Sequence, residues 1–165
     1  MRLRRKLYGL SAVGRIEVTS QFALPPDKVW EQVQRPAVLL HIARPILSFI
    51  SRDGGWPEKW EHREYVAGLR AFGFLPVGEQ VIGIEFQGEE TTGYRLRDNG
   101  RGGLISKWDH MMMIDPEGDG TRYTDRVDIE AGLLTPLVCA FAKFFYTHRQ
   151  KRFQALIASD FKELG

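Results

Sequence analysis

The chain has 165 residues, the size of one ordinary domain with a hydrophobic core of its own. Its 43% hydrophobic and 27% charged residues argue against a disordered or a fibrous protein. The 23 basic and 21 acidic residues give a net charge of +2, which is too balanced for a concentrated nucleic-acid-binding face. We therefore expect a single globular domain over residues 1–165 and no nucleic-acid partner.

Targeting and redox signals are few. No apolar stretch approaches the ~18 residues needed to cross a bilayer, so we expect no integral membrane association. A basic cluster at residues 2–6 lies in a segment, residues 1–12, that we expect to be solvated and flexible; a membrane-surface or partner contact is the alternative. The single cysteine, Cys139, precludes an internal disulfide, and cytoplasm is the expected compartment.

The first elements are a strand and two short helices. Residues 15–22 alternate between apolar and polar side chains, which is the period of a half-buried strand. The Pro-Pro-Asp sequence at 25–27 ends that strand and begins a helix, because proline suits the first turn and an acidic side chain complements the dipole. Pro36 ends this helix, and residues 37–42 are predicted to form a second one.

A series of strands occupies the middle of the chain. Gly-, Asp- and Asn-rich turns at 87–90, 98–103 and 115–120 separate them, and such short connections require antiparallel pairing. Residues 67–76 are interpreted as a loop or a broken strand. The predicted strands cover residues 46–52, 61–67, 77–86, 91–97, 105–114 and 121–129.

The last ~30 residues have the three- and four-residue spacing of a long amphipathic helix. A sheet with one apolar face needs a cover, and this helix is the one predicted element long enough to provide it. Lys143, Thr147, Gln150 and Asp160 lie off its predicted apolar stripe, and Arg149 flanks it. The stripe consists of Leu134, Leu137, Val138, Phe141, Phe144, Phe145, His148, Arg152, Ala155 and Leu156.

Four motifs, in this order and spacing, resemble the START/SRPBCC superfamily, which includes polyketide cyclase/dehydrase and lipid-transport proteins. They are FALPPDKVW at 22–30, WDH at 108–110, GTRYTDRV at 120–127 and a helix ending in His148-Arg149. The resemblance covers nearly the whole chain. It implies an α+β helix-grip fold, with a curved antiparallel sheet wrapped around a long C-terminal helix and two short helices after the first strand. It also implies a cavity used for lipids, polyketides or other apolar molecules, but no particular reaction.

The strands at 105–114 and 121–129 predict which side chains face that cavity. Trp108, His110, Met112 and Ile114 share the more apolar face of the first strand. Thr121, Tyr123, Asp125, Val127 and Ile129 share that of the second. A six-residue loop at 115–120 would place Ile114 opposite Thr121, Met112 opposite Tyr123, His110 opposite Asp125 and Trp108 opposite Val127. A His110–Asp125 pair is therefore predicted to point into the cavity.

Three roles are open for this pair: a hydrogen-bonded pair that satisfies itself in the core, an anchor for a ligand, or an acid–base catalyst. His148 and Arg152 lie one turn apart on the helix stripe and must be paired, reach the pocket mouth or meet an acidic ligand group. Structural pairing, for example with Asp125, is one interpretation, and a carboxylate-bearing ligand is the other. The predicted ligand-binding residues are Trp108, His110, Met112, Tyr123, Asp125, Phe141, Phe145, His148 and Arg152, with His110 and Asp125 as catalytic candidates.

Aromatic residues also surround a glycine-marked segment after the second predicted strand. Trp56, Trp60 and Tyr65 could gate the cavity or form a packed cluster beneath the loop. Trp30 is predicted to anchor the first helix in the core. His41 has no partner that the sequence identifies.

Several functional motifs are missing from the sequence. The four histidines lack metal-ligand spacing, and no GxxxxGK[ST], GxGxxG or GxSxG motif occurs, so we expect neither a metal nor a cofactor. The leading expectation is a carrier of a small hydrophobic molecule that is lipid-, polyketide- or quinone-like. The first alternative is a metal-free lyase or isomerase of the cyclase/dehydrase type that uses His110 and Asp125. The second is a protein–protein interaction domain with a filled cavity.

Overall fold

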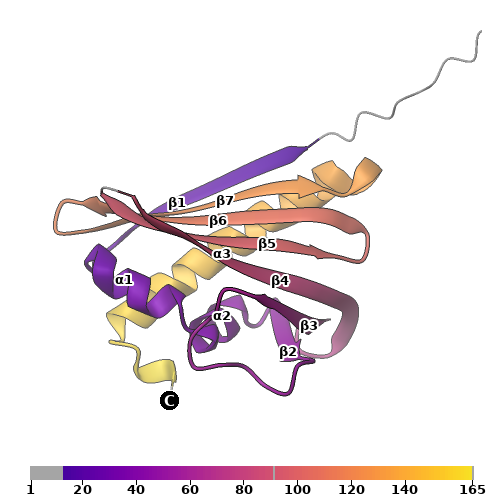
Figure 1. Ribbon diagram of the computed structural model, residues 1–165, viewed down its shortest axis with the longest axis horizontal. Helices are drawn as coiled ribbons and strands as arrows, with labels where there is room; N and C mark the ends of the chain where they lie inside the picture. The colour runs from indigo at the N-terminus through magenta and orange to yellow at the C-terminus, as the bar shows by residue number, and fades with distance from the viewer. Residues whose placement is uncertain (1–12, 91, 165) are drawn as a thin grey trace, which may run out of the picture.

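The computed structural model describes residues 13–90 and 92–164, and its main element is a curved seven-stranded antiparallel sheet (Figure 1). The strand order is β1-β7-β6-β5-β4-β3-β2, so strands from β2 to β7 follow the chain and β1 joins β7 at one edge. The predictions for residues 1–12 lie outside the described residues. The strands are β1 (Gly14–Phe22), β2 (Leu47–Ser51), β3 (Glu64–Ala71), β4 (Leu75–Glu90), β5 (Gly93–Gly102), β6 (Ile105–Glu117) and β7 (Gly120–Glu130).

Three α-helices lie on the inner face of this sheet. The helices α1 (Pro26–Val33) and α2 (Pro36–Ala43) follow β1, and each has a proline in its first turn, as predicted. The long helix α3 (Thr135–Ala158) crosses the sheet diagonally and packs mainly against β1, β7 and α2 (Figure 1). Two short 3₁₀ helices, η1 (Gly132–Leu134) and η2 (Lys162–Leu164), flank it. The predicted α+β helix-grip architecture is thus confirmed.

The packing of α3 leaves the two halves of the sheet differently filled. Under β1, β6 and β7, buried apolar side chains such as Ile16, Val127 and Phe145 form a continuous cluster with α3. A second cluster joins α1, α2 and the C-terminal half of α3, where Phe22 stacks on Tyr123 at a ring-centroid distance of 4.8 Å. The helix makes its main contacts with β1 and β7, and this placement leaves space beside β3, β4 and β5.

The predicted apolar stripe of α3 is wrong in phase. Leu137, Phe141 and Phe144 are exposed. Phe145 and Leu156 of the predicted stripe are buried, but the other buried residues lie off that stripe and include three polar side chains, Thr135, Arg149 and Gln150. The buried residues of α3 are Thr135, Ala142, Phe145, Tyr146, Arg149, Gln150, Phe153 and Leu156.

The three predicted turns at 87–90, 98–103 and 115–120 also differ from the structure, whereas residues 67–76 do form an interrupted strand. The segment 98–103 largely belongs to β5, and 87–90 to β4, because these strands extend as long, twisted hairpins. Residues 67–76 form the end of β3, a tight turn and the start of β4. The turn between β6 and β7 has two residues rather than six, and Gly118 adopts a φ of 58° there, a left-handed conformation that favours glycine.

The outer face of the sheet is polar and carries ion pairs between neighbouring strands. Arg97 on β5 makes a bidentate contact with Asp109 on β6, at 2.8 and 2.9 Å, and donates a third bond to Glu85 on β4 at 2.8 Å. Arg15 on β1 binds Asp128 on β7 in the same bidentate way. One face of each strand is therefore solvated and the other turned to the helices, which explains the alternation read from the sequence.

Candidate ligand-binding site

A cavity of about 440 Å³ lies between α3 and the half of the sheet that α3 leaves uncovered. Its walls come from β2 to β6, from Leu39 on α2 and from Val138, Phe141 and Phe145 on α3, and they are mainly apolar. Five polar side chains interrupt this lining: Glu79, Gln80, Asp98, Arg101 and Arg149. The volume falls within the roughly 300–1,000 Å³ of small-molecule sites in proteins.

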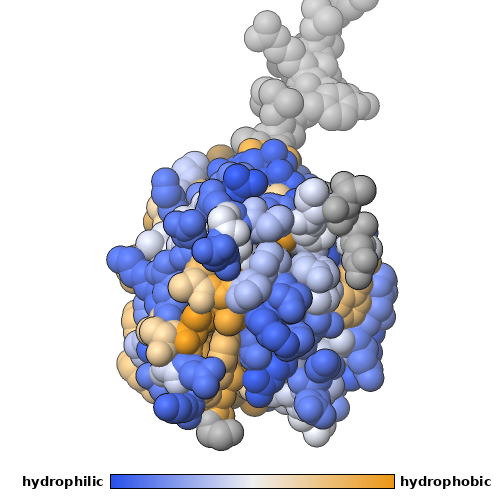
Figure 2. Space-filling view, turned by 90° about the vertical axis from the view of Figure 1, so that its left-hand side faces the viewer, coloured by the Kyte–Doolittle hydropathy of each residue, from blue (hydrophilic) through white to orange (hydrophobic). Residues whose placement is uncertain are grey.

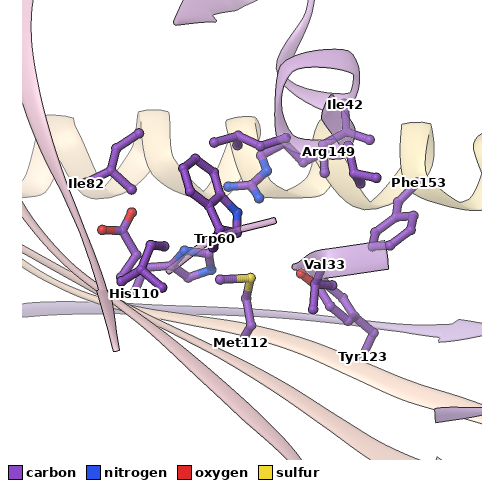
Figure 3. A pocket seen from close by; sticks show the side chains of 13 residues that line it. Val33, Ile42, Trp60, Ile82, His110, Met112, Tyr123, Arg149 and Phe153 are labelled. Carbon is purple, nitrogen blue, oxygen red and sulfur yellow. The ribbon is translucent and has the colours of Figure 1, made fainter. Parts of the chain in front are cut away.

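A smaller cavity of about 40 Å³ adjoins the first and lies deeper, toward α1 and α2 (Figure 3). Its lining includes His110, Met112 and Tyr123 from the sheet. The two cavities share four lining residues: Leu39, Ile82, Asp98 and Arg149. Polar groups therefore lie where the larger apolar cavity meets the inner one.

The larger cavity reaches the surface at the end where the β3–β4 and β5–β6 turns approach the start of α3. Two of its lining residues there, Phe72 and Leu104, are 63% and 81% exposed. Further apolar side chains on the β3–β4 turn and on η1, among them Phe74 and Leu133, are also exposed. The opposite end of the molecule, beside α1, is mostly hydrophilic apart from one hydrophobic strip (Figure 2). Exposed apolar side chains thus surround the mouth of the cavity.

The predicted His110–Asp125 pair is present, although the predicted register is wrong. In the structure His110 is opposite Val127, and Met112 is opposite Asp125, a shift of two residues caused by the short β6–β7 turn. A two-residue shift keeps every side chain on its face, and diagonal neighbours remain within reach of each other. His110 Nε2 accordingly donates to Asp125 Oδ1 at 2.7 Å, with both side chains almost fully buried.

Asp125 is the acceptor at the centre of a buried hydrogen-bond network. Besides His110, the amide of Gln150 donates to its Oδ2 at 2.9 Å, and the hydroxyl of Tyr123 donates to its Oδ1 at 3.3 Å. Burial opposes the charge of this carboxylate, but the His110 bond, electrostatic interactions with His110 and Arg149 and the Gln150 bond together lower its pKa. An ionised Asp125 fixes the His110 proton on Nε2. The Nδ1 atom of His110 makes no hydrogen bond within the described part of the chain.

Asp98 completes a row of ionisable residues across three neighbouring strands. It lies on β5 directly opposite His110, and its Oδ1 accepts a bond from the Gly83 N–H at 2.8 Å. Burial raises the pKa of Asp98 to about 6, although electrostatic interactions with His110 and Arg149 and the Gly83 bond oppose this rise. A side chain at position 83 would meet the Asn99 carbonyl oxygen at 2.6 Å, so glycine permits this close approach of the strands.

Arg149 faces these acidic residues from α3. Its side chain lies over the ring of Tyr146, 4.8 Å from the ring centre, and 5.7 Å from that of Phe145. Burial disfavours its charge, but Tyr146, Asp125 and further groups outweigh burial and raise its pKa, so the guanidinium is positively charged. Tyr146 itself accepts a hydrogen bond from the indole of Trp108 at 3.1 Å.

The structure separates the predicted site residues into three groups. Trp108, His110, Met112, Tyr123, Phe141 and Phe145 line one or other cavity. Asp125 contacts His110 but does not line either space.

His148 and Arg152 form the third group, and both are engaged outside the cavities. His148 Nε2 donates to the Arg44 carbonyl at 2.8 Å. Arg152 donates to the carbonyl and to the ring nitrogen of His41, each at 3.2 Å, and His41 also contacts Glu163. The structural pairing considered for Arg152 therefore exists, with His41 and not with Asp125.

Sequence reasoning missed Asp98, Tyr146 and Arg149 as cavity residues. The sequence predicts a turn at Asp98, because Asp-Asn-Gly is typical of turns. Tyr146 and Arg149 lie on the helix face that the apolar pattern did not select. The available signal was the regular spacing of Ala142, Tyr146, Arg149 and Phe153, which tolerates one charged member.

The aromatic residues near the second strand form a packed cluster. Trp60 and Tyr65 are buried, with ring centres 5.0 Å apart, and Trp56 packs edge-on against Trp60. Trp60 also lines the inner cavity. Trp30 stacks on Tyr94 of β5 at 5.1 Å, which fixes α1 to the sheet.

Within 13–90 and 92–164, no three His, Cys, Asp or Glu side chains are grouped closely enough to hold a metal ion. None of the described helices is both long and apolar enough to span a bilayer.

The geometry defines a helix-grip fold, and solved structures share this fold. A START superfamily protein from Mycobacterium smegmatis is similar with a TM-score of 0.65 and 15% identity, over 88% of this chain and 97% of that one. The structure of Ara h 8.0201 is similar with a TM-score of 0.63 and 16% identity, over 90% of this chain and 99% of that one. An AHSA1 protein from Silicibacter pomeroyi is similar with a TM-score of 0.59 and 13% identity, over 89% of this chain and 99% of that one. At these identities the likeness concerns the fold.

The chain belongs to the family described as a domain of unknown function, DUF8410, whose model matches residues 20–157. No curated protein matches the sequence.

Proposed function

We propose that this protein binds a small hydrophobic molecule in the cavity between α3 and strands β2 to β6. The observation that carries the proposal is the cavity itself, with a volume of about 440 Å³ and a mainly apolar wall, at a place where a filled core would be expected. Native interiors are close-packed, so a space of this size forfeits packing energy in the free protein. A ligand that fills it restores those contacts.

The apolar wall supplies the affinity in this proposal. Each buried Å² of apolar ligand surface contributes about 25 cal/mol, so about 300 Å² gives roughly 7 kcal/mol before the costs of association. The exposed apolar side chains at the mouth, including Phe72 and Leu104, offer a surface along which an apolar molecule can pass from a lipid phase into the cavity.

The structurally similar START superfamily protein also has a sheet wrapped around a long helix. This likeness of fold agrees with a ligand-binding role. The lipid-, polyketide- or quinone-like character expected from the sequence is part of the proposal, as is a cytoplasmic location.

A second candidate function is acid–base catalysis in the same cavity. The specific observation that favours it is His110, which lines the inner cavity, is oriented by Asp125 and has an Nδ1 atom with no partner in the described chain. A neutral imidazole in this state could accept a proton from a bound molecule. Binding without turnover would support the carrier, whereas turnover that His110→Phe abolishes while binding persists would support the enzyme.

The binding proposal is tested with N-phenyl-1-naphthylamine, a neutral apolar probe whose fluorescence rises in apolar sites. Val138→Trp adds bulk inside the cavity, and Leu137→Trp makes the same addition at an exposed neighbour that does not line it. We expect the wild type and Leu137→Trp to bind the probe with similar affinity and Val138→Trp to lose at least tenfold. Failure of the wild type to bind would reject the proposal, as would equal binding by both variants.

A further inference from the structure

We propose that Arg149 binds the carboxylate of the ligand, so that the molecule held in the cavity is an apolar carboxylic acid. The inference rests on the proposed function and specifies the chemical class of its ligand. It starts from the state of the Arg149 side chain, which is only 6% exposed. Within the described residues this guanidinium makes no ion pair and no hydrogen bond, and its Nε atom is fully buried without an acceptor.

An unpaired buried guanidinium is costly, since transfer of a charge from water is compensated only by an opposite charge with good hydrogen bonds. The carboxylates nearest to it in the fold are already engaged. Asp125 accepts from His110, Gln150 and Tyr123, and the Oδ1 of Asp98 accepts from the Gly83 N–H. Neither carboxylate forms an ion pair with Arg149.

The contacts of Arg149 hold the guanidinium without using its donors. Tyr146 and Phe145, on the same helix, lie on the guanidinium with ring centres at 4.8 and 5.7 Å. Cation–π contacts of this kind stabilise the charge and restrict the side chain while its N–H groups stay free. The free donors form the rigid fork that matches a carboxylate with two parallel hydrogen bonds.

The position of Arg149 directs that fork into the cavities. Arg149 lines both of them, at the boundary where the larger apolar space meets the inner one. Figure 3 shows the Arg149 side chain extending from α3 into the space that His110 and Met112 face from the sheet. A ligand carboxylate at this boundary leaves its apolar part in the 440 Å³ cavity, with the distal end toward the mouth.

The surrounding charges favour a monoanion. Asp98 on β5 and Asp125 on β7 face the same region as Arg149, with His110 between them on β6 and the hydroxyls of Tyr123 and Tyr146 nearby. One additional negative charge is compensated by Arg149. A phosphate dianion would bring a second charge beside two carboxylates, so this site favours a carboxylate over a phosphate.

The test measures displacement of N-phenyl-1-naphthylamine by decanoate and by methyl decanoate, which share an apolar chain but differ in charge. For the wild type we expect decanoate to bind about tenfold or more tightly than the ester, the worth of a hydrogen bond to a charged group. Arg149→Gln should abolish this preference while keeping the affinity for the ester. Lys151→Gln removes the same charge from an exposed position on α3 and should keep the preference.

The outcomes separate the inference from the proposed function. If the wild type binds the probe and decanoate and the ester displace it equally well, the carboxylate site is wrong and the apolar cavity stands. If the wild type does not bind the probe, the proposed function fails first. Should Arg149→Gln not fold, the side-chain Nε–H resonance of Arg149 in ¹⁵N-labelled wild type decides: decanoate shifts it and the ester does not, and an unmoved signal with bound decanoate overturns the inference.

Discussion

The arginines on the two sides of the sheet differ in whether they are paired with carboxylates. On the outer face Arg97 lies between Asp109 and Glu85 and uses three donors on them, in a partly solvated setting. On the inner side Arg149 is almost fully buried and has none of these contacts within the described chain. Exposed ion pairs contribute little to stability, and their loss is tolerated. A buried charge without a partner lowers stability, so its presence beside a cavity is best explained by a partner that the ligand supplies.

The largest expected difference between the faces concerns their carboxylates. Asp125→Ala should lower the free energy of unfolding by about 3–5 kcal/mol, because His110, Tyr123 and Gln150 lose their common acceptor inside the protein. Asp109→Ala on the outer face should cost about 1 kcal/mol or less, since Arg97 keeps Glu85 and water. Urea denaturation at pH 7 measures both. Equal losses in the free energy of unfolding would show that the inner network stabilises the protein no more than the outer ion pairs do.

A second substitution, Asp98→Asn, should raise the free energy of unfolding. The pKa of Asp98 is raised to about 6 from an ordinary 3.8, so folding favours its protonated form. The folded state then binds more protons between pH 4 and 6, and stability falls as pH rises through this window. Asp98→Asn removes this loss and keeps an acceptor for Gly83, so it should stabilise the protein at pH 7 by at most about 3 kcal/mol.

The pH dependence provides the control for this substitution. Near pH 4, wild type and Asp98→Asn should differ by only about 0.5 kcal/mol, since Asp98 is then protonated in the folded chain and about half ionised in the unfolded chain. Asp125 has a lowered pKa, so its contribution is lost only as pH falls further, and it is common to both proteins. Thermal unfolding at pH 4 and pH 7 measures the difference. A variant destabilised at pH 7 would mean that Asp98 is needed in its charged form.

The smallest expected effect on stability lies at the mouth of the cavity. Leu104→Ser should change the free energy of unfolding by less than about 0.5 kcal/mol, because this side chain is exposed. It should nevertheless slow the transfer of N-phenyl-1-naphthylamine from phospholipid vesicles to the protein several-fold, because Leu104 lines the mouth. Phe144→Ser, a similar apolar-to-polar change at an exposed position on α3 that lines neither cavity, is the matched control. Identical transfer rates would exclude this route of uptake.

The fold and the inward faces of β6 and β7 could be predicted because period-two alternation is a strong signal when one face is solvated. His110 and Asp125 were paired correctly despite a wrong turn length, since a register error of two residues preserves the faces. Long-range packing decides which face of a helix is buried, and it leaves a weaker signal in the sequence than the alternation of a strand does. On α3 the most apolar stripe belongs largely to the mouth and the surface, while the buried face contains Arg149 and Gln150.

The wrong prediction of a turn at Asp98 has a related cause. Asp98 occupies a sequence typical of turns, and only the extension of β5 past it places the carboxylate opposite His110. Of the three cavity residues that local patterns missed, Asp98 and Arg149 are charged groups in an apolar setting. Such positions violate the patterns that specify a fold, and they concentrate where a protein performs its function.

The central claim, that the cavity holds an apolar molecule, is tested most directly by native mass spectrometry of the freshly purified protein, followed by organic extraction. We expect a fraction of the wild type to carry an additional mass that is released as an apolar carboxylic acid, and Val138→Trp purified in parallel to carry none. A wild-type protein with only the mass of the bare chain, an extract identical to that of Val138→Trp, and no binding of N-phenyl-1-naphthylamine would contradict the account.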